Sequence, residues 1–277
     1  MPERYIDLHI HTQASDGTSS ADDVYLRAQK AGLAAFAITD HDTLDGYFGI
    51  RNLVDGDKIE LVPAVELSGY LKGADVHILG YFVNPDHPLL TQRLAQLKQA
   101  RKDRAASIVF KLNQLGLNLS MVRVQEIAGH STIGRPHIAD ALLKNGFTSN
   151  YDEAFQKYIG TDGPAYEPKK YMSAQEAIDL IHSAGGAAVL AHPGILGRDD
   201  LIIDLLEMQL DGIEAFHCQH DNYLTNHYIQ TARKYGLAYS GGSDCHGLRK
   251  GRFLLGSVKV PHNCLTMLRK AKETRFK

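Results

Sequence analysis

The sequence predicts an α/β fold with a mostly parallel sheet or barrel, interrupted once by a long helical stretch. Two observations lead to this prediction. Short apolar, β-branched runs alternate with segments of helical periodicity in both terminal parts of the chain, as in strand–helix–strand units. From residue 88 to about residue 163, by contrast, no convincing strand pattern occurs. The 277 residues, 44% of them hydrophobic, suffice to bury one large core or two smaller ones.

The predicted strands are short runs rich in apolar and β-branched residues. They cover residues 5–10, 34–39, 60–66, 76–83, 187–191, 212–216, 237–240 and 254–260. Segments with the 3.6-residue period of a helix lie between them and cover residues 20–31, 45–53, 173–184, 200–206 and 224–235.

The stretch without strands carries its own helical patterns, at residues 89–115, 121–128, 138–145 and 152–159. We expect it to form a helical insertion between a strand and the later half of the α/β body. The predicted organisation is therefore a barrel domain made of residues 1–87 and 164–277, and an insertion subdomain of residues 88–163 that caps the substrate.

The overall composition excludes several classes of protein. The formal net charge of −2 gives no global attraction to nucleic acid or to a membrane surface. There is no signal-peptide pattern and no apolar run near the roughly 18 residues that span a bilayer. The three cysteines lack C-x-x-C spacing and fit a reducing compartment. We expect a cytoplasmic protein without membrane association and without an obligate protein partner.

Histidine is the unusual component, with 14 residues in the chain. Asp7, His9 and His11 alternate along the first predicted strand, so that His9 and His11 project from one face near its carboxyl end. Other histidines and carboxylates also lie at or just after strand ends: His41, Glu66, His192, Asp244 and His246. Functional sites of α/β barrels are built at this end of the strands.

A cluster of this composition favours metal binding. Imidazole nitrogens with carboxylate oxygens suit Zn²⁺, Mn²⁺ or Fe²⁺, and so many polar groups at one barrel mouth are costly unless cations order them. Each residue alone has another interpretation. His77, inside an apolar strand, suits a core histidine; Asp40 and Asp42 suit helix caps; Gly241 and Gly242 suit a turn. The repetition of ligand types at separate strand ends favours the metal site.

Several motifs, in this order along the chain, resemble the PHP family, the polymerase and histidinol phosphatase metal-dependent phosphoesterases. They are Asp-Leu-His-Ile-His-Thr (7–12), Ser-Asp-Gly (15–17), Ile-Thr-Asp-His-Asp (38–42), Val-Glu-Leu (65–67), His-Ile-Leu-Gly (77–80), Ala-His-Pro (191–193) and Gly-Ser-Asp-Cys-His (242–246). The resemblance implies a distorted (β/α)7 barrel that carries the helical insertion subdomain. It also implies two or three divalent metals per chain, with Mn²⁺ as the first expectation and Fe²⁺ or Zn²⁺ as alternatives.

The resemblance further implies a set of ligands. A first metal would be held by His9, His11, Glu66 and Asp244, a second by Asp16, His41 and His246, and a third by Glu66, His77 and His192. Several trinuclear members have a histidine where this chain has Asp16. Asp16 is therefore also a candidate for acid–base catalysis.

Within the family, the chain resembles the subgroup of 3′,5′-nucleotide bisphosphate phosphatases and 5′–3′ exoribonucleases. We expect removal of the 3′-phosphate of a nucleoside 3′,5′-bisphosphate by a metal-activated hydroxide, for example from adenosine 3′,5′-bisphosphate to give AMP. Asp16 and His217 are the candidate catalytic residues. The candidate substrate-binding residues are Arg101, Arg104, Arg135, His137 and His220.

Other functions remain open at this stage. The same site could act as a 5′–3′ exoribonuclease on short 5′-phosphorylated RNA or as a histidinol-phosphate-type phosphatase. A non-catalytic metal-binding module and a C–N hydrolase are further alternatives. The complete ligand set argues against the module, and the arginines favour a phosphate substrate over C–N hydrolysis.

Overall fold

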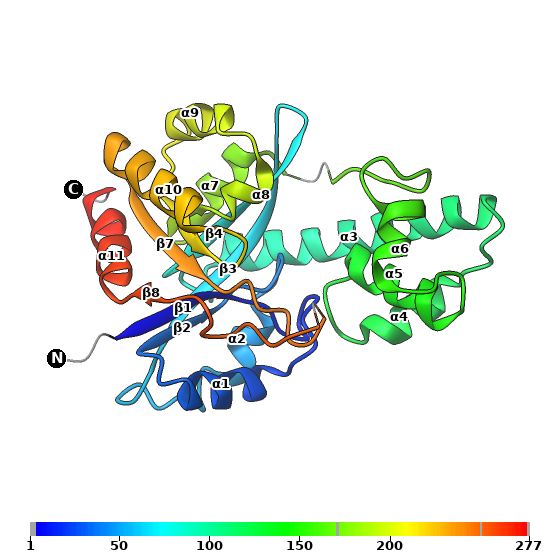
Figure 1. Ribbon diagram of the computed structural model, residues 1–277, viewed down its shortest axis with the longest axis horizontal. Coiled ribbons are helices and arrows are strands. Elements are labelled where there is room, and N and C mark those ends of the chain that lie inside the picture. Colours follow the sequence, from blue (N-terminus) through cyan, green and yellow to red (C-terminus); the bar gives the residue numbers. More distant parts are fainter. Residues whose placement is uncertain (1–3, 170–171, 250, 276–277) are drawn as a thin grey trace.

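The strands curve into one nearly closed barrel in a computed structural model that describes residues 4–169, 172–249 and 251–275 (Figure 1). Their order in the sheet is β7-β6-β5-β4-β3-β2-β1-β8. The bounds are β1 (Tyr5–Ile10), β2 (Ala35–Ile38), β3 (Glu60–Leu71), β4 (Ala74–Tyr81), β5 (Ala187–Leu190), β6 (Gly212–His217), β7 (Ala238–Gly242) and β8 (Val260–Pro261). A bridge between Ile10 and Cys245 joins the end of β1 to the loop after β7. This is the α/β barrel predicted from the sequence.

One strand in the middle of the sheet, β4, and the short edge strand β8 run against the direction of the others. β1, β2 and β3 pair in parallel, as do β5, β6 and β7, but β4 is antiparallel to both of its neighbours. A two-residue turn with positive φ at Lys72 (45°) and Gly73 (87°) joins β3 to β4, as in a tight hairpin. Because β4 runs the other way, His77 in its first half lies at the mouth where the parallel strands end.

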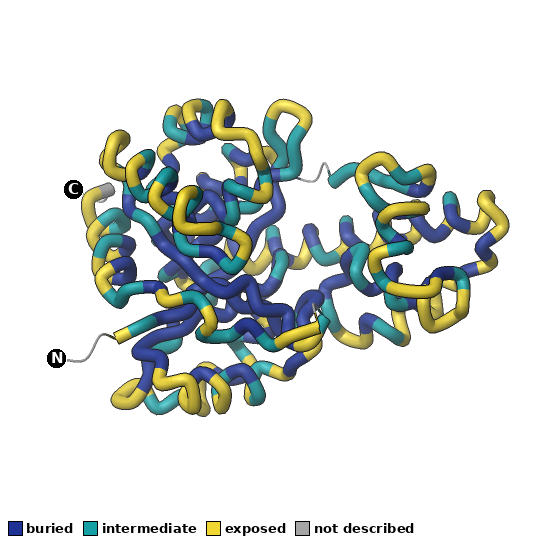
Figure 2. Tube along the Cα trace, viewed as in Figure 1, coloured by how far each residue is buried: buried dark blue, intermediate teal, exposed yellow. Residues whose placement is uncertain are grey.

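Helices cover the barrel and form the insertion. Around the barrel lie α1 (Ala21–Lys30), α2 (Asp45–Ile50), α7 (Ala174–Ser183), α8 (Pro193–Leu196), α9 (Asp200–Glu207), α10 (Asn222–Tyr235) and α11 (Asn263–Arg275). The insertion comprises α3 (Pro88–Gln114), α4 (Met121–Ala128), α5 (Arg135–Lys144), α6 (Tyr151–Ala154) and the π-helix η1 (Phe155–Ile159). The strands are buried and the helices expose their outer faces (Figure 2). Within the described residues, none of these helices has the length and apolarity to cross a membrane.

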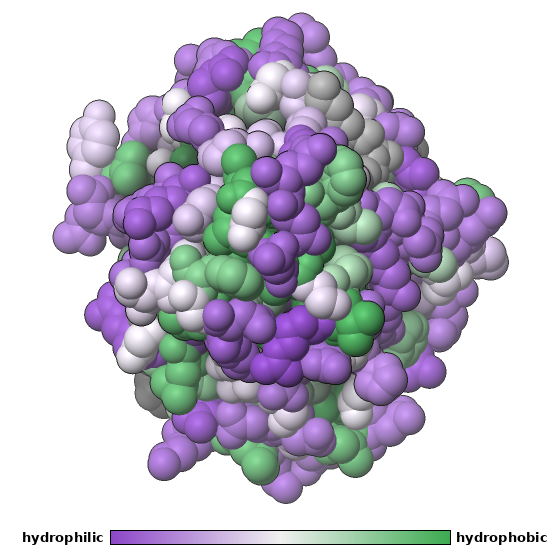
Figure 3. Space-filling model, turned by 90° about the vertical axis from the view of Figure 1, so that its right-hand side faces the viewer, coloured by the Kyte–Doolittle hydropathy of each residue, from purple (hydrophilic) through white to green (hydrophobic). Residues whose placement is uncertain are grey.

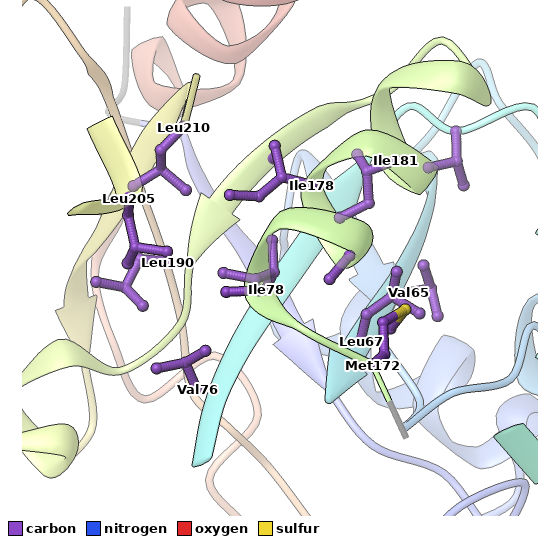
Figure 4. Close-up of a cluster of buried hydrophobic side chains, with 14 of the residues drawn as sticks. Val65, Leu67, Val76, Ile78, Met172, Ile178, Ile181, Leu190, Leu205 and Leu210 are labelled. Carbon is purple, nitrogen blue, oxygen red and sulfur yellow. The ribbon is translucent and has the colours of Figure 1, made fainter. Parts of the chain in front are cut away.

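Alternation along the strands divides the barrel residues between two apolar clusters. Val65 and Ile78 pack outward with Ile178 and Ile181 of α7, in a cluster that also contains Leu190 (Figure 4). Their neighbours Ala64, Leu79 and Val189 belong to a second cluster, which also contains Leu265 and Leu268 of α11. Glu66 and His77 follow the register of the second set, so the period of two directs them into the barrel.

The insertion has an apolar core of its own. Ile108 and Leu112 of α3, Val124 of α4 and Ile138 of α5 are fully buried together. The first half of α3 instead packs on the barrel, through residues such as Leu90. Figure 3 shows the end of the molecule that carries the insertion, where hydrophilic residues predominate and smaller hydrophobic patches lie between them.

Several details of the predicted elements were wrong, and three of them concern the ends of the barrel or its helices. Residues 254–259 form turns instead of a strand, because Gly256 donates its N–H to the buried carboxylate of Asp7 (2.8 Å) and the ladder begins only at Val260. The helix predicted at 45–53 ends at Ile50. Helix α11 was not predicted, since its charged sequence buries only a narrow stripe that includes Leu265 and Leu268.

Candidate metal centre

Loops and strand ends at the barrel mouth bring together all nine residues predicted as metal ligands. They form four overlapping groups, each with donor atoms within 4.8 Å of one another. The groups are His11, Asp16, His41 and His246; His9, His11 and Asp244; His9, Glu66 and His192; and His41, Glu66 and His77. The sharing of residues between groups suits a cluster of several ions better than a single ion.

Glu66 lies at the centre of the cluster and is completely buried. Its Oε1 lies 2.8 Å from His77 Nδ1 and 3.1 Å from His192 Nε2. Its Oε2 lies 2.9 Å from His41 Nδ1 and 3.2 Å from His11 Nε2. The two carboxylate oxygens therefore face different histidines, an arrangement in which one carboxylate can bridge two cations.

Asp16 and Asp244 supply the other carboxylates. Asp16 Oδ1 lies 3.4 Å from His246 Nε2, and its Oδ2 lies 3.8 Å from His41 Nε2. Burial opposes ionisation of Asp16, but His246 and His41 hold its pKa well below the ordinary value. Burial likewise opposes ionisation of Asp244, but His246 holds the pKa of that carboxyl well below the ordinary value. Both groups are thus carboxylates at neutral pH, the form that binds cations.

His9 and His11 differ from His77 in their affinity for a proton. Although burial disfavours the charged ring, Glu214 and Glu66 raise the pKa of His9 well above its usual value. Burial is likewise outweighed at His11, where Asp244 and Glu66 raise the pKa to about 10. At His77, burial and then the Lys169 ammonium lower the pKa to about 3. Carboxylates thus attract positive charge to His9 and His11, while His77 is held as a neutral ring.

The residues fit metal ions. His9 Nε2 and His11 Nε2 lie 3.1 Å apart, although two ring nitrogens can share at most one proton. Within the described part of the chain, His41 Nδ1 and Glu66 Oε2 are buried without a hydrogen bond of acceptable geometry. Buried polar atoms in this state are rare unless an ion or a water satisfies them. The facing ring nitrogens, the buried atoms without a hydrogen bond and the buried carboxylates together form a suitable environment for divalent cations that take nitrogen and oxygen ligands.

Glu214 on β6 supports the cluster and was not predicted from the sequence. Its Oε1 lies 2.9 Å from His9 Nδ1, and its Oε2 accepts the backbone N–H of His192 (2.7 Å). A carboxylate on the remote nitrogen of a ligand histidine fixes the ring and its tautomer. The available signal was a lone carboxylate inside the apolar strand Gly-Ile-Glu-Ala-Phe.

Asp40 and Asp42 fix the loops around His41 and do not cap a helix. Asp40 accepts hydrogen bonds from the hydroxyls of Thr12 and Ser15, both at 2.6 Å. Asp42 accepts the backbone N–H of Ser68 (2.9 Å) and pairs with Arg101 at 2.6 Å. The N-cap position of the following helix α2 is Leu44, which makes no side-chain cap.

The backbone is strained next to the cluster. Asp42, His192 and Asp244 are non-glycine residues with positive φ, at 52°, 29° and 49° respectively. Such conformations cost about 1–3 kcal/mol each and persist where surrounding contacts impose them. At His192 the imposing contact is the hydrogen bond from its own N–H to Glu214.

A cationic cavity of about 150 Å³ opens beside the cluster, between the barrel and the insertion. Its lining includes Asp16, His41 and His77 together with Arg101, Arg104, Arg135, Lys169, Thr132 and Phe155. The hydroxyl oxygen of Thr132, which is 1% exposed, has no hydrogen-bond partner among the described residues. Burial and then Arg101 lower the pKa of Lys169 to about 8. Crowded cations and an unsatisfied hydroxyl favour an anionic ligand.

The predicted arginines hold different positions in this cavity. Arg101 donates to Asp42 (2.6 Å) and to Ser68 Oγ (2.8 Å), so two of its N–H groups are bonded to residues of the barrel and its charge is paired with Asp42. Arg104 donates its Nε–H to the carbonyl of Glu167 (2.7 Å). Arg135 begins α5, with its guanidinium 5.9 Å from the Phe155 ring and 5.5 Å from the Tyr166 ring.

The three other predicted site histidines lie around the cluster. His217 is buried, and its Nδ1 accepts the N–H of Gln219 (3.1 Å), so its proton sits on Nε2, 3.5 Å from Asp244 Oδ2. His220 uses Nδ1 on the carbonyl of Ala215 (2.9 Å) and Nε2 on the N–H of Gly194 (3.1 Å). His137 lines a neighbouring groove outside the cationic cavity. Contacts of these residues with substrate stay predictions.

Comparison with known proteins gives a consistent family. A model of the PHP domain matches residues 7–186. The chain is 32% identical over 247 residues to the 5′-3′ exoribonuclease Rnm of Escherichia coli, covering 87% of this chain and 84% of the relative. It is 30% identical over 252 residues to the 3′,5′-nucleoside bisphosphate phosphatase of Chromobacterium violaceum, covering 89% and 88%.

A third relative has another activity. The chain is 32% identical over 261 residues to the phosphoribosyl 1,2-cyclic phosphate 1,2-diphosphodiesterase of Eggerthella lenta, covering 92% of this chain and 98% of the relative. Among solved structures, a protein of Bifidobacterium adolescentis assigned to the metal-dependent phosphoesterases superposes with a TM-score of 0.87 at 28% identity, covering 98% and 97% of the two chains. The similarity thus extends over nearly the whole chain, and all three relatives act on phosphate esters.

Proposed function

The chain belongs to the PHP-domain family of phosphoesterases, and on that premise we propose that it removes the 3′-phosphate of nucleoside 3′,5′-bisphosphates. The barrel mouth would hold the metals and the scissile phosphate. The insertion, residues 88–163, would act as a cap that binds the second phosphate. Mn²⁺ is the first metal to test, with Fe²⁺ and Zn²⁺ next, because all three accept nitrogen and oxygen ligands.

The cationic cavity beside the cluster is the observation that carries this proposal. A bisphosphate has two anionic groups, and the molecule offers one metal-ligand cluster and one adjoining cavity lined by Arg104, Arg135 and Lys169. Guanidinium groups match phosphate oxygens in a planar fork. The N-terminus of α5 adds a favourable dipole, and the buried Thr132 hydroxyl adds a donor.

The catalytic chemistry follows from the ligand types. When bound at the nine ligands, divalent metals would lower the pKa of a coordinated water toward about 7 and neutralise charge on the phosphoryl group. Glu66, Asp16 and Asp244 supply the anionic oxygens that hold such ions together. Arg135 and its neighbours orient the substrate by its second phosphate.

Proton positions restrict the roles of the two candidate catalytic residues. Asp16 is ionised at neutral pH, so it can bind a cation or accept a proton but does not carry one to donate. His217 carries its proton on Nε2, which faces Asp244 within the cluster. Of the two, His217 is therefore the candidate for a hydrogen bond from Nε2–H to the leaving ribose oxygen, which stabilises the developing charge without transfer of the ring proton.

The second candidate function is 5′–3′ exoribonuclease activity on short RNA. It is favoured by the 32% identity with the exoribonuclease of Escherichia coli over 87% of this chain. The same cavity could receive the 5′-phosphate of an RNA, with the first phosphodiester at the metals. Both reactions would use the same two anion sites and the same leaving ribose 3′-oxygen. They differ in what the attacked phosphorus carries, which is no further group in the bisphosphate and the rest of the chain in the RNA.

Product release by protein loaded with Mn²⁺ tests the proposal. The substrates are adenosine 3′,5′-bisphosphate, a short 5′-phosphorylated RNA, phosphoribosyl 1,2-cyclic phosphate and histidinol phosphate. We expect the highest kcat/KM with the bisphosphate, with AMP and inorganic phosphate as products. A higher kcat/KM with the RNA would establish the exoribonuclease instead. Preference for either of the other substrates would contradict both assignments of the cavity.

A further inference from the structure

Asp16 reaches the metal cluster from a loop, without support from a regular strand. The loop follows β1 and turns back on itself, with the N–H groups of Ser15 and Gly17 both donating to the carbonyl of Thr12 (3.1 and 2.9 Å). Such a turn fixes the path of the chain locally. It does not by itself fix how far the Asp16 carboxylate extends toward His41 and His246, so another contact must set that distance.

Arg249, in the loop after β7, makes that contact. Its Nε–H donates to the backbone carbonyl of Asp16 at 2.7 Å. The bond uses the carbonyl and leaves both carboxylate oxygens of Asp16 directed at the histidines. A cation that bound the carboxylate itself would compete with a metal ion, and this one does not.

The insertion holds Arg249 in place. Its Nη1 donates to Asp140 Oδ2 of α5 at 2.7 Å, and its guanidinium lies 5.6 Å from the ring of Tyr151. The side chain of Arg249 is only 10% exposed. Asp140 neutralises the charge, so the guanidinium can lie beside a metal cluster without strong repulsion.

A second set of bonds ties the insertion to the same loop. The N–H of Thr132 donates to the carbonyl of Ala14 at 2.9 Å, and the hydroxyl of Ser131 donates to the carbonyl of Gln13. The loop that carries Asp16 is therefore held by the insertion on one side and by Arg249 on the other. In Figure 1 the loops after β1 and β7 both extend toward the insertion.

We propose that Arg249 is a positioning residue that couples docking of the helical insertion to completion of the metal centre through Asp16. The guanidinium must serve two different acceptors, because its Nε–H holds the Asp16 carbonyl while its Nη1–H is held by Asp140. The inference depends on Asp16 being a metal ligand, as proposed above, and on no particular substrate.

Metal binding by purified protein tests this inference without an activity assay. Protein stripped with chelator is titrated with Mn²⁺, and free Mn²⁺ is followed by electron paramagnetic resonance. We expect Arg249→Met to weaken the class of sites that Asp16→Asn also weakens, by about 10- to 100-fold, as for other residues that orient metal ligands. Arg123→Met is the matched control, since Arg123 lies on α4 of the insertion and pairs only at the surface with Glu126.

Arg249→Lys separates positioning from folding. Lysine keeps the charge and can pair with Asp140, but it lacks the planar fork that serves two acceptors. We expect a folded protein, by circular dichroism, with the same class of sites weakened. Wild-type Mn²⁺ affinity in folded Arg249→Lys and Arg249→Met would overturn the inference. Wild-type affinity in Asp16→Asn would instead overturn the assignment of Asp16 as a ligand, and the inference with it.

Discussion

Glu214 has two oxygens and serves two different ligands of the metal centre. It contacts His9 through Nδ1 and holds the strained backbone of His192 through its N–H. Both contacts place a hydrogen-bond donor against a carboxylate oxygen. An amide at this position would satisfy one of them and turn a donor toward the other.

We therefore predict that Glu214→Gln lowers Mn²⁺ affinity by about 10- to 100-fold, the usual effect of losing a partner that orients a ligand. The measurement is Mn²⁺ titration of chelator-treated protein, with Glu126→Gln as the control because Glu126 pairs only with Arg123 on the surface. Equal affinity in Glu214→Gln and wild type would show that His9 and His192 keep their positions without this carboxylate.

On the proposed function, Arg135 would distinguish a substrate with two phosphates from one with a single phosphate. A hydrogen bond to a charged group contributes about 1.5–3 kcal/mol, so Arg135→Ala should raise KM for the bisphosphate by about 10- to 100-fold. KM for a nucleoside 3′-monophosphate should change little. Steady-state kinetics on the two substrates, with Arg123→Ala as control, decide the point. An equal rise for both would mean that Arg135 acts on the fold of the insertion.

Metal binding should release protons. In protein stripped of metal, nearby carboxylates outweigh burial and raise the pKa values of His9 and His11, that of His11 to about 10, so at pH 7 the pair keeps a proton between its facing Nε2 atoms. A metal must displace this proton, and apparent affinity should therefore rise with pH up to about 10. His77, with a pKa of about 3, is already neutral and contributes no proton. Calorimetry at pH 7 in two buffers of different ionisation enthalpy measures the release. Identical heats in both buffers would contradict the prediction.

For single residues, the sequence predicted which side chains form the cluster but not the residues that hold those side chains in position. Histidines 9, 11, 41 and 192 could be identified because each lies at a strand end, a property of neighbouring residues. Glu214 contacts His192 and Arg249 contacts Asp16, and in each pair the two residues lie more than 20 positions apart in the sequence. Such partners are set by the packing of distant segments. The sequence marks Glu214 only as a lone carboxylate in an apolar strand, and it does not mark Arg249.

Helix α3 links the two parts of the molecule as a single element. Leu90, Leu94 and Leu97 pack on the barrel, whereas Ile108 and Leu112 belong to the core of the insertion. Arg101 and Arg104 lie between these stretches and line the cationic cavity. The helical period of residues 89–115 was evident in the sequence, but the change of partner along the helix was not, because both stretches are equally apolar.

The close contact between β7 and β1 leads to a prediction at Gly242. A Cβ atom at this position would collide with the backbone of His9. Gly242→Ala must therefore move β1 or β7, which we expect to cost about 1–3 kcal/mol, as overpacking does. Since β1 carries His9 and His11, Mn²⁺ affinity should fall as well.

Gly56→Ala is the control for this variant, because a Cβ there meets no atom within 4 Å. Thermal unfolding and Mn²⁺ titration of both variants provide the test. Wild-type stability in Gly242→Ala would mean that the barrel closes loosely enough to accept a methyl group beside His9.

At the scale of the whole molecule, the barrel was predictable and the direction of β4 was not. Strand–helix alternation identified both halves of the barrel. The absence of strand patterns between them identified the helical insertion. The reversal of β4 depends on two residues, Lys72 and Gly73, whose positive φ angles make a hairpin. The predicted strand 60–66 stopped short of that turn, so the hairpin was not foreseen, and His77 was grouped with the other predicted ligands by the family resemblance alone.

The metal centre joins segments from both ends of the chain, and its occupancy should therefore control global stability. The predicted ligands come from β1 and the loop after it, from β3 and β4, and from the segments after β2, β5 and β7, so unfolding any part of the barrel disperses them. A ligand that binds only the folded state at 100 times its Kd stabilises by about 2.7 kcal/mol. For a chain of this size we expect chelation to lower Tm by about 5–10 °C.

Differential scanning calorimetry with and without chelator measures this shift, and added Mn²⁺ should restore the original Tm. Glu66→Gln provides the control, because loss of the central carboxylate weakens the centre and should leave chelator with little further effect. An equal fall in Tm in Glu66→Gln would show that the chelator acts elsewhere. An unchanged Tm in the wild type would mean that the barrel closes independently of its metals, with the buried carboxylates balanced by the positive charge of the His9–His11 pair alone.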